Sequence, residues 1–125
     1  MDVLSEAKEK GIIKCHGASI HSLDAMKLAA TSPWCAVHLQ GINHAGVRMD
    51  GTRDDVVAVL KQSKANGKGV LAMKVLGEGR LRDQINKTLN FVMGVGCVDA
   101  FTIGAANREE LADLIKRVPA SSQAA

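Results

Sequence analysis

The sequence predicts an α/β fold in which four β/α units build a parallel sheet. Strands are expected to begin near residues 12, 34, 69 and 98, and intervals of about 30 residues are typical of β/α units. The expected strands are continuous apolar runs, as in parallel sheets covered by helices. Amphipathic helices are expected between them. An open parallel sheet and half of a (β/α)8 TIM barrel both fit this pattern, and we take the half barrel as the expected fold class.

Length and composition narrow the class of protein. The 125 residues suffice for one domain with a buried core, expected over residues 1–118, with a disordered tail over 119–125. The net charge of +3 is dispersed, and one Trp, two Phe and no Tyr leave few platforms for base stacking, so no nucleic-acid partner is expected. No apolar stretch reaches the roughly 20 residues of a membrane span, and the N-terminus lacks a signal-peptide pattern. We therefore expect a cytoplasmic protein without a membrane partner.

The three cysteines lie in or beside apolar runs and are expected to be buried thiols. They are Cys15, Cys35 and Cys97. Cys15, His16 and His21 approach the spacing of metal ligands, which zinc requires in tetrahedral geometry. However, Cys15 and His16 are adjacent on an expected strand and would point to opposite faces. We therefore expect no metal site.

The chain is expected to begin with a helix over residues 2–10, followed by a strand over 12–18. Gly11 between them has the conformational freedom that commonly ends a helix. Ser22 is a suitable N-cap for the next helix, because its hydroxyl can accept a hydrogen bond from a first-turn N–H group. The apolar stripe of that helix consists of Leu23, Met26 and Ala30.

The second strand is expected over residues 34–39, after Pro33 has ended the preceding helix. A longer loop covers residues 40–51. Thr52 then begins a capping-box pattern that predicts the start of the third helix. The inward side of this helix is expected to consist of Val56, Val59, Leu60 and Ser63.

The third and fourth strands are expected over residues 69–75 and 98–103. The helix between them is marked by apolar residues at nearly four-residue spacing, namely Leu81, Ile85, Leu89 and Val92. Asn107 is a suitable N-cap for the last helix, with Glu110 three positions further on. The inward face of the last helix is expected to consist of Leu111, Leu114, Ile115 and Val118.

Glycine-containing turns follow the third and fourth strands and are candidate phosphate sites. In residues 76–80 (LGEGR), glycine lets backbone N–H groups approach a phosphate, although a plain tight turn needs the same glycines. In residues 104–110, the strand ends at Gly104 and Arg108 lies in the first turn of the following helix. An anion can bind at such a helix end, and the alternative is a solvent-facing arginine.

Ser19 and Lys74 are candidates because each stands near the end of an expected strand. Ser19 could bond to a ligand amide, or it could be a turn residue beside Gly17. Lys74 ends an apolar run, where an ammonium group needs a partner. Strand ends line the active site of a barrel, so we expect Lys74 to contact a ligand. The sequence has neither a nucleophile elbow nor the glycine fingerprint of a Rossmann fold.

Three segments together resemble the aldo/keto reductase family. They are residues 10–22 (KGIIKCHGASIHS), 73–79 (MKVLGEG) and 101–104 (FTIG) with the capped helix that follows. The resemblance covers nearly the whole chain and corresponds to the family's C-terminal half, strands five to eight of a (β/α)8 barrel. It implies NAD(P)H-dependent reduction of a small carbonyl substrate to an alcohol. NAD or NADP would lie across the carboxyl-terminal face of the barrel.

The resemblance also implies a cofactor site. Ser19 matches the serine that holds the nicotinamide carboxamide, with Ile20 where asparagine is usual. Met73 stands where an aromatic residue often stacks on the nicotinamide. Glu110 stands where many NADP-preferring members have Arg or Gln, which slightly favours NAD. The implied cofactor-binding residues are Ser19, Lys74, Leu76, Gly77, Gly104, Asn107, Arg108 and Glu110.

No catalytic residue is assigned. The family's catalytic Asp, Tyr, Lys and His come from the first four strands of the barrel, and this chain has no Tyr. Because carbonyl reduction needs a general acid, we expect a partial chain that is inactive alone. Two alternatives stay open. One is a non-catalytic half barrel that forms a homodimer or binds a missing N-terminal half; the other is a phosphate-binding fragment of another barrel.

Overall fold

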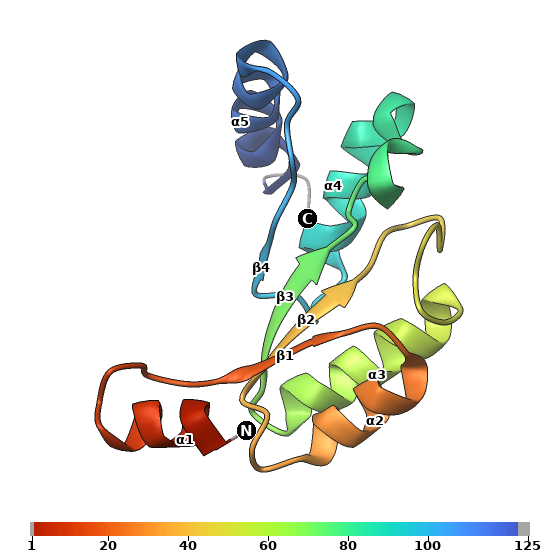
Figure 1. The fold of residues 1–125 in the computed structure, drawn as a ribbon. Helices are drawn as coiled ribbons and strands as arrows, with labels where there is room; N and C mark the ends of the chain where they lie inside the picture. Colours follow the sequence, from red (N-terminus) through yellow and green to blue (C-terminus); the bar gives the residue numbers. More distant parts are fainter. Residues whose placement is uncertain (1, 123–125) are drawn as a thin grey trace.

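The computed structural model describes residues 2–122, in which helices alternate with four parallel strands (Figure 1). The strands follow one another across a single sheet in the order β1-β2-β3-β4, which confirms the expected α/β architecture. The strands are Gly17–Ile20 (β1), Val37–Gly41 (β2), Gly69–Met73 (β3) and Ala100–Phe101 (β4). The helices are Asp2–Glu9 (α1), Leu23–Thr31 (α2), Arg53–Ala65 (α3), Ile85–Gly94 (α4) and Arg108–Ser122 (α5). Two 3-10 turns, Gly77–Gly79 (η1) and Arg82–Gln84 (η2), precede α4.

The strands are shorter than expected and are shifted along the chain. The first two were expected to begin at residues 12 and 34 but begin at Gly17 and Val37. Gly17 is the register partner of Val37, which in turn is the partner of Gly69, so the three strands begin at one level of the sheet. Residues before that level have no strand beside them. The residues at which the strands begin are therefore set by pairing with the neighbouring strand, and not by the start of an apolar run in the sequence.

The expected helix caps and stripes are confirmed for α2 and α3. Ser22 Oγ accepts a hydrogen bond from the Ala25 N–H group at 3.2 Å, and Thr52 Oγ1 accepts one from Asp55 at 3.2 Å. These bonds satisfy donors that have no partner inside the helix. The buried residues of the two helices are Met26, Ala30, Val56, Val59, Leu60 and Ser63.

Helix α5 differs from expectation. Leu114 is buried, but Leu111 and Ile115 are 49% and 63% exposed, so the prediction that they face inward is wrong. The reason is that α5 packs beside α4 and not on the sheet (Figure 1). The helix runs on to Ser122, past the start of the expected tail at residue 119. Residues 123–125 of that tail lie outside the described part of the chain.

The hydrophobic core lies between one face of the sheet and the helices α2, α3 and α4 (Figure 1). Along β3, Val70 and Ala72 are fully buried on that face, whereas Leu71 between them is 38% exposed on the other. Within residues 2–122, helices therefore cover only one face of the sheet. No helix in this part is long and apolar enough to span a membrane.

Two cysteines behave as expected and one does not. Cys35 and Cys97 are buried, and burial raises the pKa of the Cys97 thiol. Cys15 is exposed, so its predicted burial is wrong. It precedes the start of β1, in the segment that was expected to be a strand and is irregular.

His38 lies on the helix-covered face of β2 and is fully buried. Its ring nitrogens make no hydrogen bond of normal geometry with residues 2–122. Burial lowers the pKa of its imidazole below the ordinary 6.5, and the positive charge of Lys68 lowers it further, while the backbone of Ala29 acts in the opposite direction. The folded state thus favours the neutral form of this imidazole.

Asn43 is a buried residue in the loop after β2, and its side chain is fully hydrogen-bonded. Its Nδ2 atom donates to the carbonyl oxygens of Val47 at 2.7 Å and Lys74 at 3.1 Å. Its Oδ1 atom accepts from the N–H groups of Ala45 at 3.2 Å and Val47 at 3.0 Å. One side chain therefore closes the loop and ties it to the end of β3.

We expect the stability of the protein to fall as the pH drops below 6.5. The unfolded chain takes up a proton at His38 as the pH falls through its ordinary pKa of 6.5, while the folded chain, whose His38 pKa is lower, does so only at lower pH. The loss reaches at most about 1.4 kcal/mol per pH unit. Urea unfolding of His38→Leu and wild type at pH values above and below 6.5 tests this. His38→Leu should lose this dependence and the exposed-site control His21→Gln should keep it; an unchanged dependence in His38→Leu contradicts the assignment.

We expect Asn43→Ala to lower the free energy of unfolding by about 3 kcal/mol. The substitution removes four hydrogen bonds and leaves the backbone N–H and carbonyl groups of Val47 without their Asn43 partner, whereas the carbonyl of Lys74 keeps only its bond from the Gly77 N–H group. Chemical denaturation measures the change. The control Asn90→Ala, at an exposed position of α4, should change stability by at most about 0.5 kcal/mol. Equal effects of the two substitutions would show that the Asn43 hydrogen bonds do not contribute to the free energy of unfolding.

Candidate functional site

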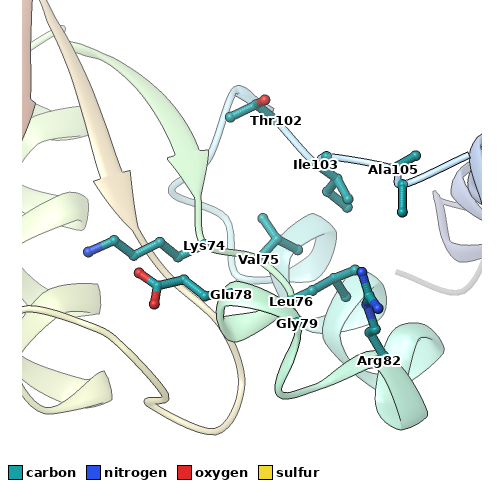
Figure 2. A pocket seen from close by; sticks show the side chains of 11 residues that line it. Lys74, Val75, Leu76, Glu78, Gly79, Arg82, Thr102, Ile103 and Ala105 are labelled. Atoms are coloured by element: carbon teal, nitrogen blue, oxygen red, sulfur yellow. The ribbon is translucent and has the colours of Figure 1, made fainter.

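A cavity of about 360 Å³ opens at the carboxyl ends of β3 and β4. It lies between the loop that follows β3 and the loop that joins β4 to α5 (Figure 2). Apolar lining comes from Val75, Leu76 and Ile103, and charged lining from Lys74, Glu78 and Arg82. The remaining lining residues are Gly79, Thr102, Gly104, Ala105 and Ala106.

A second cavity of about 220 Å³ continues from the first toward α5. The two cavities share Leu76, Arg82 and Gly104 and therefore form one cleft. The second is also lined by Ile85, Glu110, Asp113 and Leu114. Four of the residues expected to bind a cofactor thus line the cleft, namely Lys74, Leu76, Gly104 and Glu110.

Ser19 lies apart from this cleft. It is the register partner of Leu39, which is the partner of Leu71, so two strand spacings separate it from β3. Its hydroxyl is 3.2 Å from Nε2 of His21. Ser19 therefore does not line the cleft, and the structure does not bring it together with the other seven residues that were expected to bind a cofactor.

Gly77 shapes the cleft from behind and does not line it. Its φ of +55° lies in the left-handed region, and a Cβ atom there would come within 2.9 Å of Val47 Cγ1. Gly79 has a φ of +87°, and a Cβ atom on it would lie 3.6 Å from Arg82 Nε. The positive φ values of the two glycines therefore make the turn possible, and the Arg82 side chain lies within van der Waals reach of Gly79.

The first turn of α5 is capped by its own side chains. Asn107 Oδ1 accepts a hydrogen bond from the Glu110 N–H group at 2.8 Å, which confirms the expected N-cap. Glu110 Oε2 accepts in return from the N–H group of Ala106 at 2.8 Å. The Glu110 carboxylate thus occupies the position at the helix end where an anion was expected. Arg108 is exposed and makes no ion pair within residues 2–122.

Lys74 has the partner that its position requires. Its Nζ atom lies 3.7 Å from Asp50 Oδ1, with both side chains less than a fifth exposed. Asp50 Oδ2 also accepts a hydrogen bond at 3.0 Å from the buried amide of Gln40. Arg48 Nε donates to Glu78 Oε2 at 2.6 Å and holds the pKa of the Glu78 carboxyl below its ordinary value. Charges of alternating sign therefore follow the rim from β2 to the cleft.

The backbone is strained where these charges meet. Arg48, Lys74 and Glu78 have φ values of 58°, 53° and 57°, and within residues 2–122 they are the only residues other than glycine with positive φ. Such conformations cost about 1 kcal/mol or more each and gather at functional sites. In Figure 2, Lys74 and Glu78 extend to the same side, while Arg82 points away from them. The strain thus lies at one wall of the cleft.

Arg82 is the residue that sequence reasoning missed. It lines both cavities of the cleft and also a third cavity of about 390 Å³ that contains Lys87 and Arg117. Within residues 2–122 it has no ion-pair or hydrogen-bond partner, so its guanidinium is available to a ligand. The signal in the sequence was a second arginine two positions after Arg80, directly beyond the glycine turn.

His16 and His21 have separate partners, and Cys15 is an exposed free thiol. The His16 ring stacks on Trp34 with a centroid distance of 4.4 Å, and His21 lies beside Ser19. The described part of the chain contains no cluster of three His, Cys, Asp or Glu side chains that could hold a metal ion.

Comparison of the chain with protein-family models, curated proteins and solved structures finds no match.

We expect Gly77→Ala to cost more stability than Gly67→Ala. Both glycines have positive φ, so both alanines are strained by about 1 kcal/mol. Only at Gly77 does the new methyl group also meet Val47, whereas nothing lies within 4 Å at Gly67. Denaturant unfolding should show about 1 kcal/mol of additional loss for Gly77→Ala. Equal losses of stability would mean that Val47 moves aside for the new methyl group without a further loss of stability.

Proposed function

We propose that this chain is the cofactor-binding half of an aldo/keto reductase-like barrel and that it binds a nicotinamide dinucleotide in the cleft after β3 and β4. The observation that carries the proposal is the sharing of Leu76, Arg82 and Gly104 by two adjoining cavities at the carboxyl ends of parallel strands. Ligands of parallel α/β folds bind at that end of the sheet.

The chemistry of the cleft suits such a ligand. Arg82 supplies an unpaired guanidinium for a phosphate, and a planar guanidinium binds phosphate through two parallel hydrogen bonds. The N–H groups of Gly104 and Ala105 make no hydrogen bond with residues 2–122 and are free for phosphate oxygens. Val75, Leu76 and Ile103 provide an apolar wall for a ring. These groups would hold NAD or NADP.

A bound nicotinamide would supply the hydride for reduction of a small carbonyl compound. That reduction also requires a proton donor at the carbonyl oxygen, and the chain has no tyrosine for the role that the family resemblance implies. We therefore propose binding without turnover by this chain alone. The choice between NAD and NADP stays open, because the Glu110 carboxylate is engaged by the N–H group of Ala106.

A second candidate is a phosphate-binding fragment of another barrel. It is favoured by the third cavity, where Arg82, Lys87 and Arg117 contribute three cations against the single carboxylate of Asp83. Arg117 is paired with Asp113 at 2.5 Å, which leaves Arg82 and Lys87 for an anion. A simple sugar phosphate would fit this chemistry without a nicotinamide.

We expect isothermal calorimetry to detect binding of NADH or NADPH and to show about tenfold weaker binding by Arg82→Gln. The expected loss corresponds to one charge-assisted hydrogen bond to a phosphate. Arg80→Gln is the matched control, since Arg80 is exposed two residues away and lines none of the three cavities. It should bind as the wild type does.

The same titrations separate the candidates. Binding of a sugar phosphate with no response to either dinucleotide would favour the phosphate-binding fragment. No binding of any of these ligands would overturn both proposals. Robust reduction of aldehydes by the purified chain with NADH or NADPH would contradict the absence of a catalytic acid.

A further inference from the structure

One face of the sheet carries apolar side chains that no helix covers in residues 2–122. Ser19 of β1, Leu39 of β2, Leu71 of β3 and Ala100 of β4 are register partners and form one row across the sheet, apolar in its last three members. Leu71, at the middle of this row, is 38% exposed. Parallel sheets occur almost only with both faces covered. We name as the open face the side chains of Val37, Leu39, Leu71, Met73 and Ala100.

Exposed apolar side chains also occur on the two helices that adjoin the edge strands in the sequence. On α1, which precedes the edge strand β1, Val3 and Leu4 are exposed. On α5, which follows the edge strand β4, Leu111 and Ile115 are exposed. Figure 1 shows α1 and α5 at opposite ends of the fold, away from the layer formed by α2 and α3. A copy placed beside the β1 or β4 edge would therefore meet a helix with exposed apolar side chains next to that strand in the sequence.

The exposed area has the size of an interface. The chain exposes 7314 Å², whereas a folded monomer of its 13.2 kDa mass is expected to expose roughly 6,400 Å². The excess of roughly 900 Å² is close to the area of about 800 Å² that each partner buries in a standard protein–protein interface. The surplus therefore has the size of the surface that one partner contributes to such an interface.

We infer that this chain pairs with a second copy of itself, open face against open face. Two-fold pairing places β1 of each copy beside β4 of the other, so both free edges of each sheet gain a parallel neighbour. Eight strands result, the number at which side chains just fill the interior of a closed barrel. None of the five side chains of the open face is charged, so like faces do not repel each other.

A second copy meets all of these requirements at once. In each chain, β1 and β4 are the edge strands of the sheet. In a parallel barrel made of two copies, the β1 edge of one copy would pair with the β4 edge of the other. The inference rests on the fold and not on the proposed nucleotide. The cleft is built from the loops beyond the carboxyl ends of β3 and β4, outside the open face, so pairing leaves it accessible.

Sedimentation equilibrium of the full chain tests the inference directly. We expect a species of twice the 13.2 kDa chain mass at micromolar concentration. Leu71→Glu places a charge at the centre of the open face and should abolish pairing. Because that variant could also unfold, Ile115→Glu is the second test: this side chain is 63% exposed in the single chain, so the fold tolerates the charge. It should weaken pairing about tenfold.

Leu28→Glu is the matched control. Leu28 is 72% exposed on α2, on the opposite side of the sheet from the open face, and its substitution should leave the dimer unchanged. A wild-type chain that stays a folded monomer at about 100 μM, well above the dissociation constants of specific dimers, overturns the inference. So does an equal loss of pairing in Ile115→Glu and Leu28→Glu, or a dimer that survives in folded Leu71→Glu.

Discussion

One buried amide, that of Asn43, holds together the loops on which the candidate site is built. Its four hydrogen bonds satisfy backbone groups of Ala45, Val47 and Lys74. Each of these groups would cost about 1–3 kcal/mol if buried without a partner. Because Asn43 follows β2 and Lys74 follows β3, the amide fixes the two strand ends relative to each other. The Lys74 carbonyl also accepts from the Gly77 N–H group at 2.8 Å, so the turn behind the cleft begins from the same point.

The charges along the rim follow from this backbone arrangement and do not create it. Arg48, Lys74 and Glu78 are all held in the left-handed region, which costs about 1 kcal/mol or more for each. The Arg48–Glu78 pair is about half exposed on both sides, and such a pair contributes about 0–1 kcal/mol. The exposed Arg48–Glu78 pair alone therefore does not offset the strain. The four hydrogen bonds of the buried Asn43 amide contribute more, and they fix the backbone that carries Lys74 beside the cleft.

Features that depend on neighbouring residues, such as helix caps, could be predicted from the sequence. Features that depend on pairing between segments far apart in the sequence, such as strand boundaries, could not. Ser22, Thr52 and Asn107 cap their helices as expected, because a cap depends on residues two or three positions away. The strand boundaries were displaced, because they depend on register between segments about 30 residues apart. Within the site, the two glycine-containing loops were predicted, but Arg82 was missed. Arg82 lies just beyond the glycine turn, and only the folded loops bring its side chain to the cavities.

The sequence pattern of continuous apolar strands predicts a sheet buried on both faces, yet helices cover one face only in the described residues. The surplus of roughly 900 Å² per copy is close to the area that one partner buries in a standard interface. Covering the face would remove its apolar side chains, Leu71 among them, from water. A dinucleotide in the cleft leaves Leu39 and Leu71 uncovered, because it lies beyond the strand ends. Ligand binding in the cleft and self-association through the open face therefore involve different surfaces: the first uses the loops beyond the strand ends, and the second covers the exposed apolar face of the sheet.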